Sequence, residues 1–373
     1  MADGQDILAL LQIVMTPKVG PRTGRALIEH FGSAAAVLKA SRRDLQEIQG
    51  IGGKIAENIQ RPFREEDAEA EMNLARDHNV KLIAFDEEEY PDGIRRLGDD
   101  APLILYIKGN FIPQDDLAIA IVGSRAATHY GRKAAKQISF GIASAGVTII
   151  SGLARGIDGV AHQAALDAKG RTIAVVGNGL ATVYPAEHKE LAEKISANGA
   201  VISELPMKTG PEAGNFAPRN RLISALSHGV VIVEAGLKSG TLMTANWALE
   251  QGKEVFAVPG NIDSPNSQGT HRLIKEGARL VENAEDVLRS LGPLPSAVRT
   301  ADDSSVADPR TLSLKGPEKQ VFDVLDSVGQ GVDELIQKTG LTAPVVNSVL
   351  TILVVKRLAQ QIAGQRYVRA ATV

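Results

Sequence analysis

The stretch Ile119-Ala120-Ile121-Val122-Gly123-Ser124-Arg125 joins a run that is apolar on both faces to a glycine and two polar side chains. Similar short apolar runs recur over residues 103–290, and most are followed by a glycine-bearing loop and a helical stretch. Such alternation is typical of a parallel sheet covered by helices on both sides. The sequence therefore predicts an α/β fold, an extended Rossmann-like, doubly wound and mostly parallel sheet that binds ligands beyond the C-terminal ends of its strands. The expected strands are Leu117–Val122, Val147–Ile150, Thr172–Val176, Val201–Ile202, Val230–Val233 and Val255–Val258.

Composition and periodicity divide the chain into four parts. Residues 1–62 contain short helical stretches broken by glycines and predict a small all-α N-terminal domain of the helix-hairpin-helix or SAM-like kind. Residues 63–291 form the predicted Rossmann-like core, whose acidic lead-in 63–100 is expected to be a helix followed by a loop. A polar, proline-marked linker is expected over 292–314, and three helical stretches with a short hairpin predict a C-terminal winged-helix domain over 315–373.

The composition is that of an ordinary globular protein, because 44% of the 373 residues are hydrophobic and 23% are charged. The chain contains no cysteine, which excludes disulfides, thiolate nucleophiles and cysteine-ligated clusters and fits a reducing compartment. The N-terminus carries an early acidic residue and no basic region, and no apolar run approaches the ~20 residues that cross a bilayer. We therefore expect a cytoplasmic protein.

The formal net charge of −3 argues at first against a nucleic-acid partner, since such proteins are usually basic. The charge is unevenly distributed, however. Residues 63–100 hold 13 acidic and 5 basic residues, whereas 117–280 hold 17 basic and 12 acidic residues. The whole-chain charge thus averages an acidic connector with a mildly basic centre, and it leaves room for a local anion site.

Four loops that follow predicted strands carry the candidate site. A strand that ends in glycine and opens a helix directs backbone N–H groups at one point, where an anion such as phosphate can bind. An aromatic side chain beside arginines adds a stacking surface, a mixture used for single-stranded nucleic acid. Because the C-terminal ends of parallel strands share one edge, we expect the loops to converge on a polyanion site. The candidates from these loops are Gly123, Ser124, Arg125, Gly152, Arg155, Gly156, Phe216, Arg219, Asn220, Arg221, Lys238, Ser239, Gly240 and Thr241.

Other chemistries find less support. Asp158 and His162 are spaced i, i+4 and could bind a metal. Because no third ligand is evident, capping or pairing by Asp158 and packing by His162 are the favoured roles. The chain has neither the G-x-G-x-x-G dinucleotide fingerprint nor a P-loop. Glu204 and Glu234 lie near strand ends without a visible partner. No general base or paired carboxylates stand out, so binding is better supported than catalysis, and we expect no enzyme activity, cofactor or metal.

The terminal domains leave alternatives open. The segments 19–24 and 48–54 resemble paired helix-hairpin-helix signatures, in which tight glycine turns present N–H groups to a DNA phosphate, but a helical protein-interaction domain fits them equally. In the winged-helix module, only Asn347 opens the third helix with a side chain suited to reading base edges. We therefore favour partner docking or weak DNA contact there over sequence-specific recognition. The basic residues near the wing that could touch phosphates are Lys356, Arg357, Arg366 and Arg369.

Six motifs occur together in this order: Ile121–Arg125, Ser151–Asp158, Tyr184-Pro185, Arg219–Arg221, Ser239–Thr241 and Phe256–Gly260. In this combination the chain resembles the DNA-processing protein A family (DprA, also called Smf), and the likeness covers essentially the whole chain. The resemblance implies a non-catalytic, dimerising binder of single-stranded DNA that acts in natural transformation and helps load the RecA recombinase. It implies a homodimer through the Rossmann-like domain and a DNA pocket at the candidate residues given above, with Lys238–Thr241 completing it.

Some residues depart from the family pattern. The proline of its Phe-Pro-x-Arg-Asn-Arg motif falls one place later here, at Pro218, while Ala181 and Asn246 stand where acidic and arginine residues are expected. The main alternative function is a nucleotide phosphoribohydrolase with a similar fold and a G-T-x-x-E motif, but Thr244 occupies the position of that catalytic glutamate. A nucleoside or cyclic-nucleotide sensor that uses the same loops is a third possibility.

Overall fold

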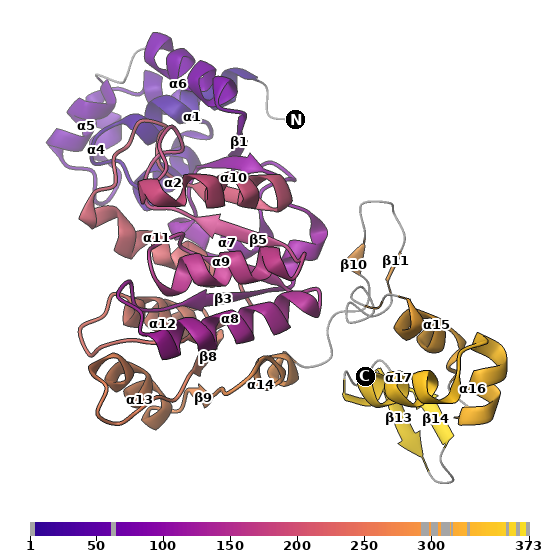
Figure 1. Cartoon of the computed structure of the whole chain (residues 1–373). Helices are drawn as coiled ribbons and strands as arrows, with labels where there is room; N and C mark the ends of the chain where they lie inside the picture. Colours follow the sequence, from indigo (N-terminus) through magenta and orange to yellow (C-terminus); the bar gives the residue numbers. More distant parts are fainter. Residues whose placement is uncertain are drawn as a thin grey trace. The chain divides into compact units, whose positions relative to one another are not determined.

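The chain's structure is a computed structural model with two compact units, of which the first ends at Val287 and the second begins at Leu288, apart from the short stretch Ser144–Val147. Each unit is described by itself (Figure 1). The residues described are 4–60, 65–291, 298–299, 305–306, 314, 316–326, 329–355, 358–362 and 366–370.

A nine-stranded sheet organises the first unit, in the order β1-β2-β6-β5-β4-β3-β7-β8-β9. The strands from β6 to β9 pair in parallel, whereas β2 pairs antiparallel with both β1 and β6. This arrangement confirms the predicted doubly wound, mostly parallel sheet, and its direction of winding reverses between β3 and β7. The strands are β1 (Val80–Ala84), β2 (Ile104–Gly109), β3 (Ala118–Val122), β4 (Thr148–Ser151), β5 (Thr172–Val175), β6 (Ala200–Ser203), β7 (Gly229–Ile232), β8 (Glu254–Ala257) and β9 (Arg279–Leu280).

Helices cover both faces of this sheet, which explains why the central strands lack polar alternation. Every residue of Ala118–Val122 is buried. Side chains of α11, α12 and α13 join the apolar cluster on one face, and right-handed crossovers place α8, α9 and α10 on the other (Figure 1). The helices are α8 (His129–Ser144), α9 (Ile157–Asp167), α10 (Lys189–Asn198), α11 (Ala213–Ala225), α12 (Thr241–Glu250), α13 (Gln268–Lys275) and α14 (Ala284–Ser290), with 3₁₀ turns η2 (Pro113–Asp116), η3 (Ala186–His188) and η4 (Pro265–Ser267).

The acidic lead-in is more ordered than the predicted helix and loop. It contains α6 (Glu65–Asp77), then β1, then α7 (Asp92–Arg95) and η1 (Gly98–Asp100). The prediction missed β1 because this strand lies at the sheet edge, where the charged Lys81 faces solvent inside an otherwise apolar run. The Glu71 carboxylate of α6 accepts a hydrogen bond from the Met207 N–H at 2.6 Å, which ties the segment to the loop after β6.

The N-terminal helices form the predicted all-α part, and their Leu11, Leu27 and Ile59 share an apolar cluster with Leu103 and Tyr106 of the sheet domain. The glycine turns differ in detail from the expectation. Gly50 has a φ of 91°, as the second turn requires, but Lys18 rather than Gly20 takes the left-handed conformation in the first. The helices are α1 (Gly4–Met15), α2 (Pro21–Phe31), α3 (Ala34–Lys39), α4 (Arg42–Gln46) and α5 (Gly53–Gln60).

The second unit confirms the predicted winged-helix domain, with three helices around one apolar core and a three-stranded sheet ordered β12-β14-β13. The elements are α15 (Pro317–Val324), β12 (Gln330–Gly331), α16 (Val332–Thr339), α17 (Ala343–Val355), β13 (Ala359–Ile362) and β14 (Arg366–Arg369).

The predicted linker 292–314 lies largely outside the described residues, including its proline-marked ends 292–295 and 308–309. Its described parts are Leu314 and the antiparallel pair β10 (Val298–Arg299) and β11 (Ser305–Val306). The domain boundaries at 62/63, 291/292 and 314/315 stay predictions. Within the described part of the chain, no helix is both long and apolar enough to cross a membrane.

Candidate nucleic-acid interface

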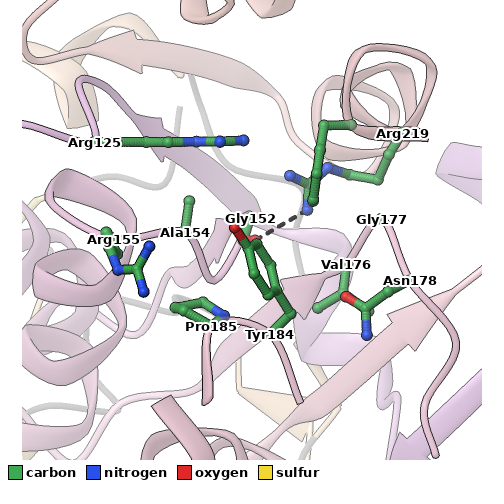
Figure 2. A pocket seen from close by; sticks show the side chains of 11 residues that line it. Arg125, Gly152, Ala154, Arg155, Val176, Gly177, Asn178, Tyr184, Pro185 and Arg219 are labelled. Atoms are coloured by element: carbon green, nitrogen blue, oxygen red, sulfur yellow. Dashed lines mark hydrogen bonds between the residues drawn. The ribbon is translucent and has the colours of Figure 1, made fainter. Parts of the chain in front are cut away.

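The loops after β3, β4 and β5 meet the start of α11 around a narrow hollow of about 30 Å³, which has room for only one or two water molecules. Figure 2 shows Arg125 and Arg219 reaching toward each other from opposite sides of this hollow, with Arg155 and the ring of Tyr184 nearby. The structure thus brings together five of the predicted site residues: Arg125, Gly152, Arg155, Phe216 and Arg219.

An arginine stacked on an aromatic ring forms one wall. The Arg125 guanidinium carbon lies 5.0 Å from the centre of the Phe216 ring, and the Tyr184 ring lies 5.8 Å from the same ring, tilted by 35°. A Cβ atom on Gly177 would lie 2.8 Å from Cδ1 of Phe216, so this glycine lets the ring approach the loop after β5. Phe216 therefore lies at the hollow rather than in the core, and its charged partner Arg125 is exposed.

A second arginine at the hollow is held by a carboxylate. The Nε and Nη2 atoms of Arg155 donate to the two carboxylate oxygens of Glu187 at 2.5 and 2.8 Å, and both side chains are exposed. This pairing lowers the pKa of Glu187 to about 2. An anion that approaches Arg155 must therefore compete with, or lie beside, the Glu187 carboxylate.

Arg219 and Asp158 form the buried support beneath the hollow. Arg219 donates to the carbonyl oxygens of Gly152, at 3.0 Å, and of Val175, while burial lowers its pKa to about 10. The Asp158 carboxylate accepts from the N–H groups of Gly152 and Ala154 at 3.1 and 3.3 Å, and burial raises its pKa. Asp158 therefore holds the loop after β4, and the capping role is wrong: the N-cap of α9 is Gly156, and no side chain of the described residues caps the helix.

His162 has the packing role that was favoured over a metal site. The side chain is fully buried, and its Nδ1 lies 2.7 Å from the Thr172 hydroxyl. Burial lowers its pKa from the ordinary 6.5 to about 3. The imidazole is therefore neutral in the folded protein at neutral pH.

This burial predicts that acid destabilises the fold through His162. Below pH 6.5, His162 is protonated in the unfolded chain but stays neutral in the folded protein. The free energy of unfolding is therefore highest above pH 6.5 and decreases as the pH falls. Between pH 7.5 and pH 5 the loss from this group should be about 2 kcal/mol. Urea denaturation across this range, compared with His162→Gln, measures it. Equal pH slopes for the two proteins would show that His162 contributes nothing.

Three of the predicted site residues, Gly123, Ser124 and Gly156, pack the loops after β3 and β4 against each other. The Ser124 N–H donates to the Glu234 carbonyl at 2.8 Å, and the Ser124 carbonyl accepts from the Ile157 N–H at 3.2 Å. A Cβ atom on Gly123 would lie 2.6 Å from Cγ1 of Ile157. Gly156 has a φ of 80°, and a Cβ atom there would clash with the backbone of Ser124. The N–H groups of Ser124 and Gly152, expected to face a phosphate, thus have partners inside the protein.

Asn220 and Arg221 are likewise not among the residues lining the hollow. Arg221 makes a paired contact with Glu204, with both N–O distances at 2.6 Å, and also donates to the carbonyl of Asp100. Asn220 Oδ1 accepts from Nε of Arg219 at 3.2 Å. The structure starts α11 at Ala213, so the entire motif is helical and Arg221 points into buried surroundings.

The fourth predicted loop, Lys238–Thr241, is also absent from the residues that line the hollow. Lys238 is exposed after β7, and the Ser239 hydroxyl accepts from the Thr241 N–H at 3.2 Å. Conversely, the candidate set omitted Tyr184, Pro185 and Asn178, which do line the hollow. The signal for Tyr184 was an aromatic residue close behind a strand-end glycine loop.

The arginines of the wing support the winged-helix domain itself. Arg366 donates to the Gly329 carbonyl at 2.5 Å, and Arg369 donates to the Phe322 carbonyl at 2.8 Å while lying 4.5 Å from the centre of its ring. Asn347 is exposed on α17. Lys356 and Arg357 lie outside the described residues.

The fold and the hollow together define a class of protein: a Rossmann-like domain with arginines and an aromatic ring at its C-terminal strand edge, a helix-hairpin-helix segment before it and a winged helix after it. Family models match each part. The DNA recombination-mediator protein A family matches residues 81–292, the SAM-like helix-hairpin-helix tandem matches 7–65, and the DprA winged helix domain matches 305–365. The chain belongs to the DNA recombination-mediator protein A (DprA/Smf) family.

Individual relatives agree with this assignment. Protein Smf of Escherichia coli (strain K12) is 44% identical over 270 residues, which cover 69% of this chain and 72% of that protein. The putative DNA processing protein DprA of Mycobacterium tuberculosis (strain ATCC 25618 / H37Rv) is 35% identical over 324 residues, covering 83% of this chain and 82% of that protein.

Two solved structures are similar as well. The X-ray structure of DprA from Streptococcus pneumoniae has a TM-score of 0.67 and 32% identity and covers 78% of this chain and 98% of that one. DprA from Helicobacter pylori, whose structure was described for its single-stranded DNA binding mode, has a TM-score of 0.52 and 31% identity, covering 57% and 97% of the two chains.

Proposed function

We propose that this protein binds single-stranded DNA at the C-terminal edge of its parallel sheet. The observation that carries the proposal is the exposed Arg125 stacked on Phe216, with Arg155 lining the same hollow. Guanidinium groups bind phosphates, and an aromatic face stacks on any unpaired base, so the combination suits a single strand without sequence preference. The single-stranded DNA binding mode described for the Helicobacter pylori relative supports the same choice of ligand.

The confined position of these groups agrees with the charge distribution. All residues that line the hollow belong to the mildly basic segment 117–280. The acidic segment 63–100 forms α6 and β1 instead. A limited basic site predicts moderate affinity and little nonspecific attraction elsewhere on the surface. The exposed Lys238, in the loop after β7, is proposed as a further contact of the strand outside the hollow.

Fluorescence anisotropy with a labelled single-stranded oligonucleotide at several salt concentrations tests the proposal. Each phosphate neutralised should contribute about −0.7 to the slope of log affinity against log salt concentration. We expect a clear negative slope and weaker binding of the matching duplex. Affinity that ignores salt, or that requires a duplex, contradicts the proposal.

We also propose that the protein is not an enzyme. Thr244 on α12 occupies the position at which a phosphoribohydrolase would need its catalytic glutamate. The carboxylate of Glu204 is paired with Arg221, and that of Glu234 accepts hydrogen bonds from Thr128, so neither is placed as an unpartnered general base. Incubation with a nucleoside monophosphate should release no free base on chromatography, whereas release would favour the hydrolase.

Family membership supports the remaining parts of the proposal: a cytoplasmic role in natural transformation, help in loading the RecA recombinase onto the strand, and a homodimer formed through the Rossmann-like domain. Leu249 on α12 and Leu280 on β9 are exposed apolar side chains available for such a contact. Light scattering of the full chain should give twice the monomer mass. RecA filament formation on coated single strands should be faster in its presence.

A further inference from the structure

A second and larger hollow lies at the same edge of the sheet. Its volume is about 440 Å³, within the usual range for small-molecule sites, whereas the hollow at Arg125 and Arg155 holds only about 30 Å³. It is formed by the start of α8 and the loops after β7 and β8, beside the point between β3 and β7 where the winding of the sheet reverses. Open α/β sheets bind ligands in the crevice at such a point.

The side chains that line this second hollow favour an uncharged ligand over a phosphate. Of the described residues, those that line it include no lysine, arginine or histidine. The buried carboxylate of Glu234 forms part of the wall and accepts from the Thr128 N–H and hydroxyl at 2.9 and 2.5 Å. A negative charge repels phosphate, while it and the serine hydroxyls can accept from the N–H and O–H groups of a base or sugar.

An exposed aromatic ring stands at this hollow. Tyr130, in the first turn of α8, is 49% exposed. Its hydroxyl donates to the Pro259 carbonyl at 2.6 Å, so the ring is fixed between α8 and the loop after β8. A fixed, exposed ring is a surface on which a nucleobase can stack.

The two hollows are close enough to serve one strand. Arg125 belongs to the first and Thr128 to the second, so their Cα atoms are at most about 11 Å apart. At such a separation, one strand of a few nucleotides can contact both hollows. The first hollow offers charge with little space, and the second offers space without positive charge.

We infer that the second hollow is a nucleobase subsite, in which a base with its sugar stacks on Tyr130 while Arg125 holds a neighbouring phosphate. The inference rests on the proposed function for the phosphate contact, but the base contact can be tested separately. A base in this hollow presents its Watson–Crick edge to the protein, and in a duplex that edge is paired with the other strand. The subsite thus adds selectivity for single strands to the charge-based binding at Arg125.

The test compares Tyr130→Ala with two matched variants. Loss of one base–aromatic contact should weaken binding of a short labelled thymidine oligonucleotide about 5- to 100-fold. Tyr130→Phe keeps the ring and should retain most of the affinity. Phe140→Ala removes a similarly exposed ring, 43% exposed, from the far end of the same helix and should change nothing.

An abasic oligonucleotide of the same length separates stacking from charge. The wild-type protein should prefer the base-bearing strand, and Tyr130→Ala should cost nothing on the abasic strand. Equal affinities of Tyr130→Ala and wild type for the base-bearing strand overturn the inference. Equal losses for Tyr130→Ala and Tyr130→Phe also overturn it, because the hydroxyl bond to Pro259 rather than the ring would then be responsible.

Titration with adenosine distinguishes a free nucleoside from a base delivered by the strand. If adenosine displaces the oligonucleotide from the wild-type protein, and does so less well from Tyr130→Ala, the subsite also binds a free nucleoside. If adenosine displaces nothing while Tyr130→Ala still weakens oligonucleotide binding, the base enters the subsite only as part of the strand. If the wild-type protein binds no oligonucleotide, the proposed function fails. Direct binding of adenosine that depends on Tyr130 would then still support the subsite, and no binding would overturn it.

Discussion

Replacing Arg125 with glutamate should weaken binding of a single-stranded oligonucleotide by more than tenfold while the protein stays folded. The change removes an exposed guanidinium from the hollow, places a negative charge near the bound phosphates, and removes the cation that stacks on Phe216. Tenfold corresponds to about 1.4 kcal/mol, within reach of one lost phosphate contact. The slope of log affinity against log salt concentration should also become less negative by about 0.7, the contribution of one phosphate.

Lys194→Glu is the matched control for this prediction. Lys194 is an exposed lysine in the middle of α10, is absent from the lining of both hollows, and gives the same change in net charge. It should reduce affinity less than threefold. Equal losses for the two variants would mean that only the overall charge matters, and an unchanged affinity for Arg125→Glu would remove Arg125 from the site.

Replacing Arg221 with methionine should lower the free energy of unfolding by about 3–5 kcal/mol, because removing one partner leaves the other charge buried and unpaired. The side chains of Arg221 and Glu204 are only 8% and 13% exposed, and their two N–O contacts are 2.6 Å. Urea denaturation measures the loss. The folded variant should still bind the oligonucleotide, since the guanidinium is absent from the hollow's lining.

The double variant Arg221→Met with Glu204→Met checks the cause. Replacing both charges with apolar side chains of similar size should recover much of the lost stability, since no charge is then left unpaired. A loss below 1 kcal/mol in the single variant would show that the ion pair is unimportant. Normal stability with abolished DNA binding would instead return Arg221 to the DNA site.

The sheet could be predicted from the sequence because each central strand is buried on both faces and each is followed by a glycine loop. The six expected strands match β3 to β8 to within two residues at either end. The edge strand β1 could not be recognised in the same way, since Lys81 interrupts its apolar run and its partner β2 lies 24 residues further along the chain. Edge pairing is decided by tertiary contacts that local pattern does not encode.

That the strand-end loops meet could be predicted from the sequence, but the contacts that each residue makes could not. Convergence of strand-end loops follows from parallel topology, and the structure brings Arg125, Arg155 and Phe216 together. The predicted fourth loop, Lys238–Thr241, does not line the hollow. Whether an arginine faces solvent or a buried carboxylate depends on partners distant in sequence, as Glu204 is from Arg221. Likewise, Gly123 in a strand-end turn suits both phosphate binding and the close approach of Ile157, and only the packed structure shows the latter.

Amide hydrogen exchange with and without a saturating thymidine oligonucleotide tests the central claim most directly, because it locates the strand on the full chain. The account predicts slower exchange in the loops over 123–130 and 152–156 and around Tyr184 and Phe216, which surround the two hollows. Protection confined to the helix-hairpin-helix turns or to the winged-helix domain, with these loops unchanged, would contradict it.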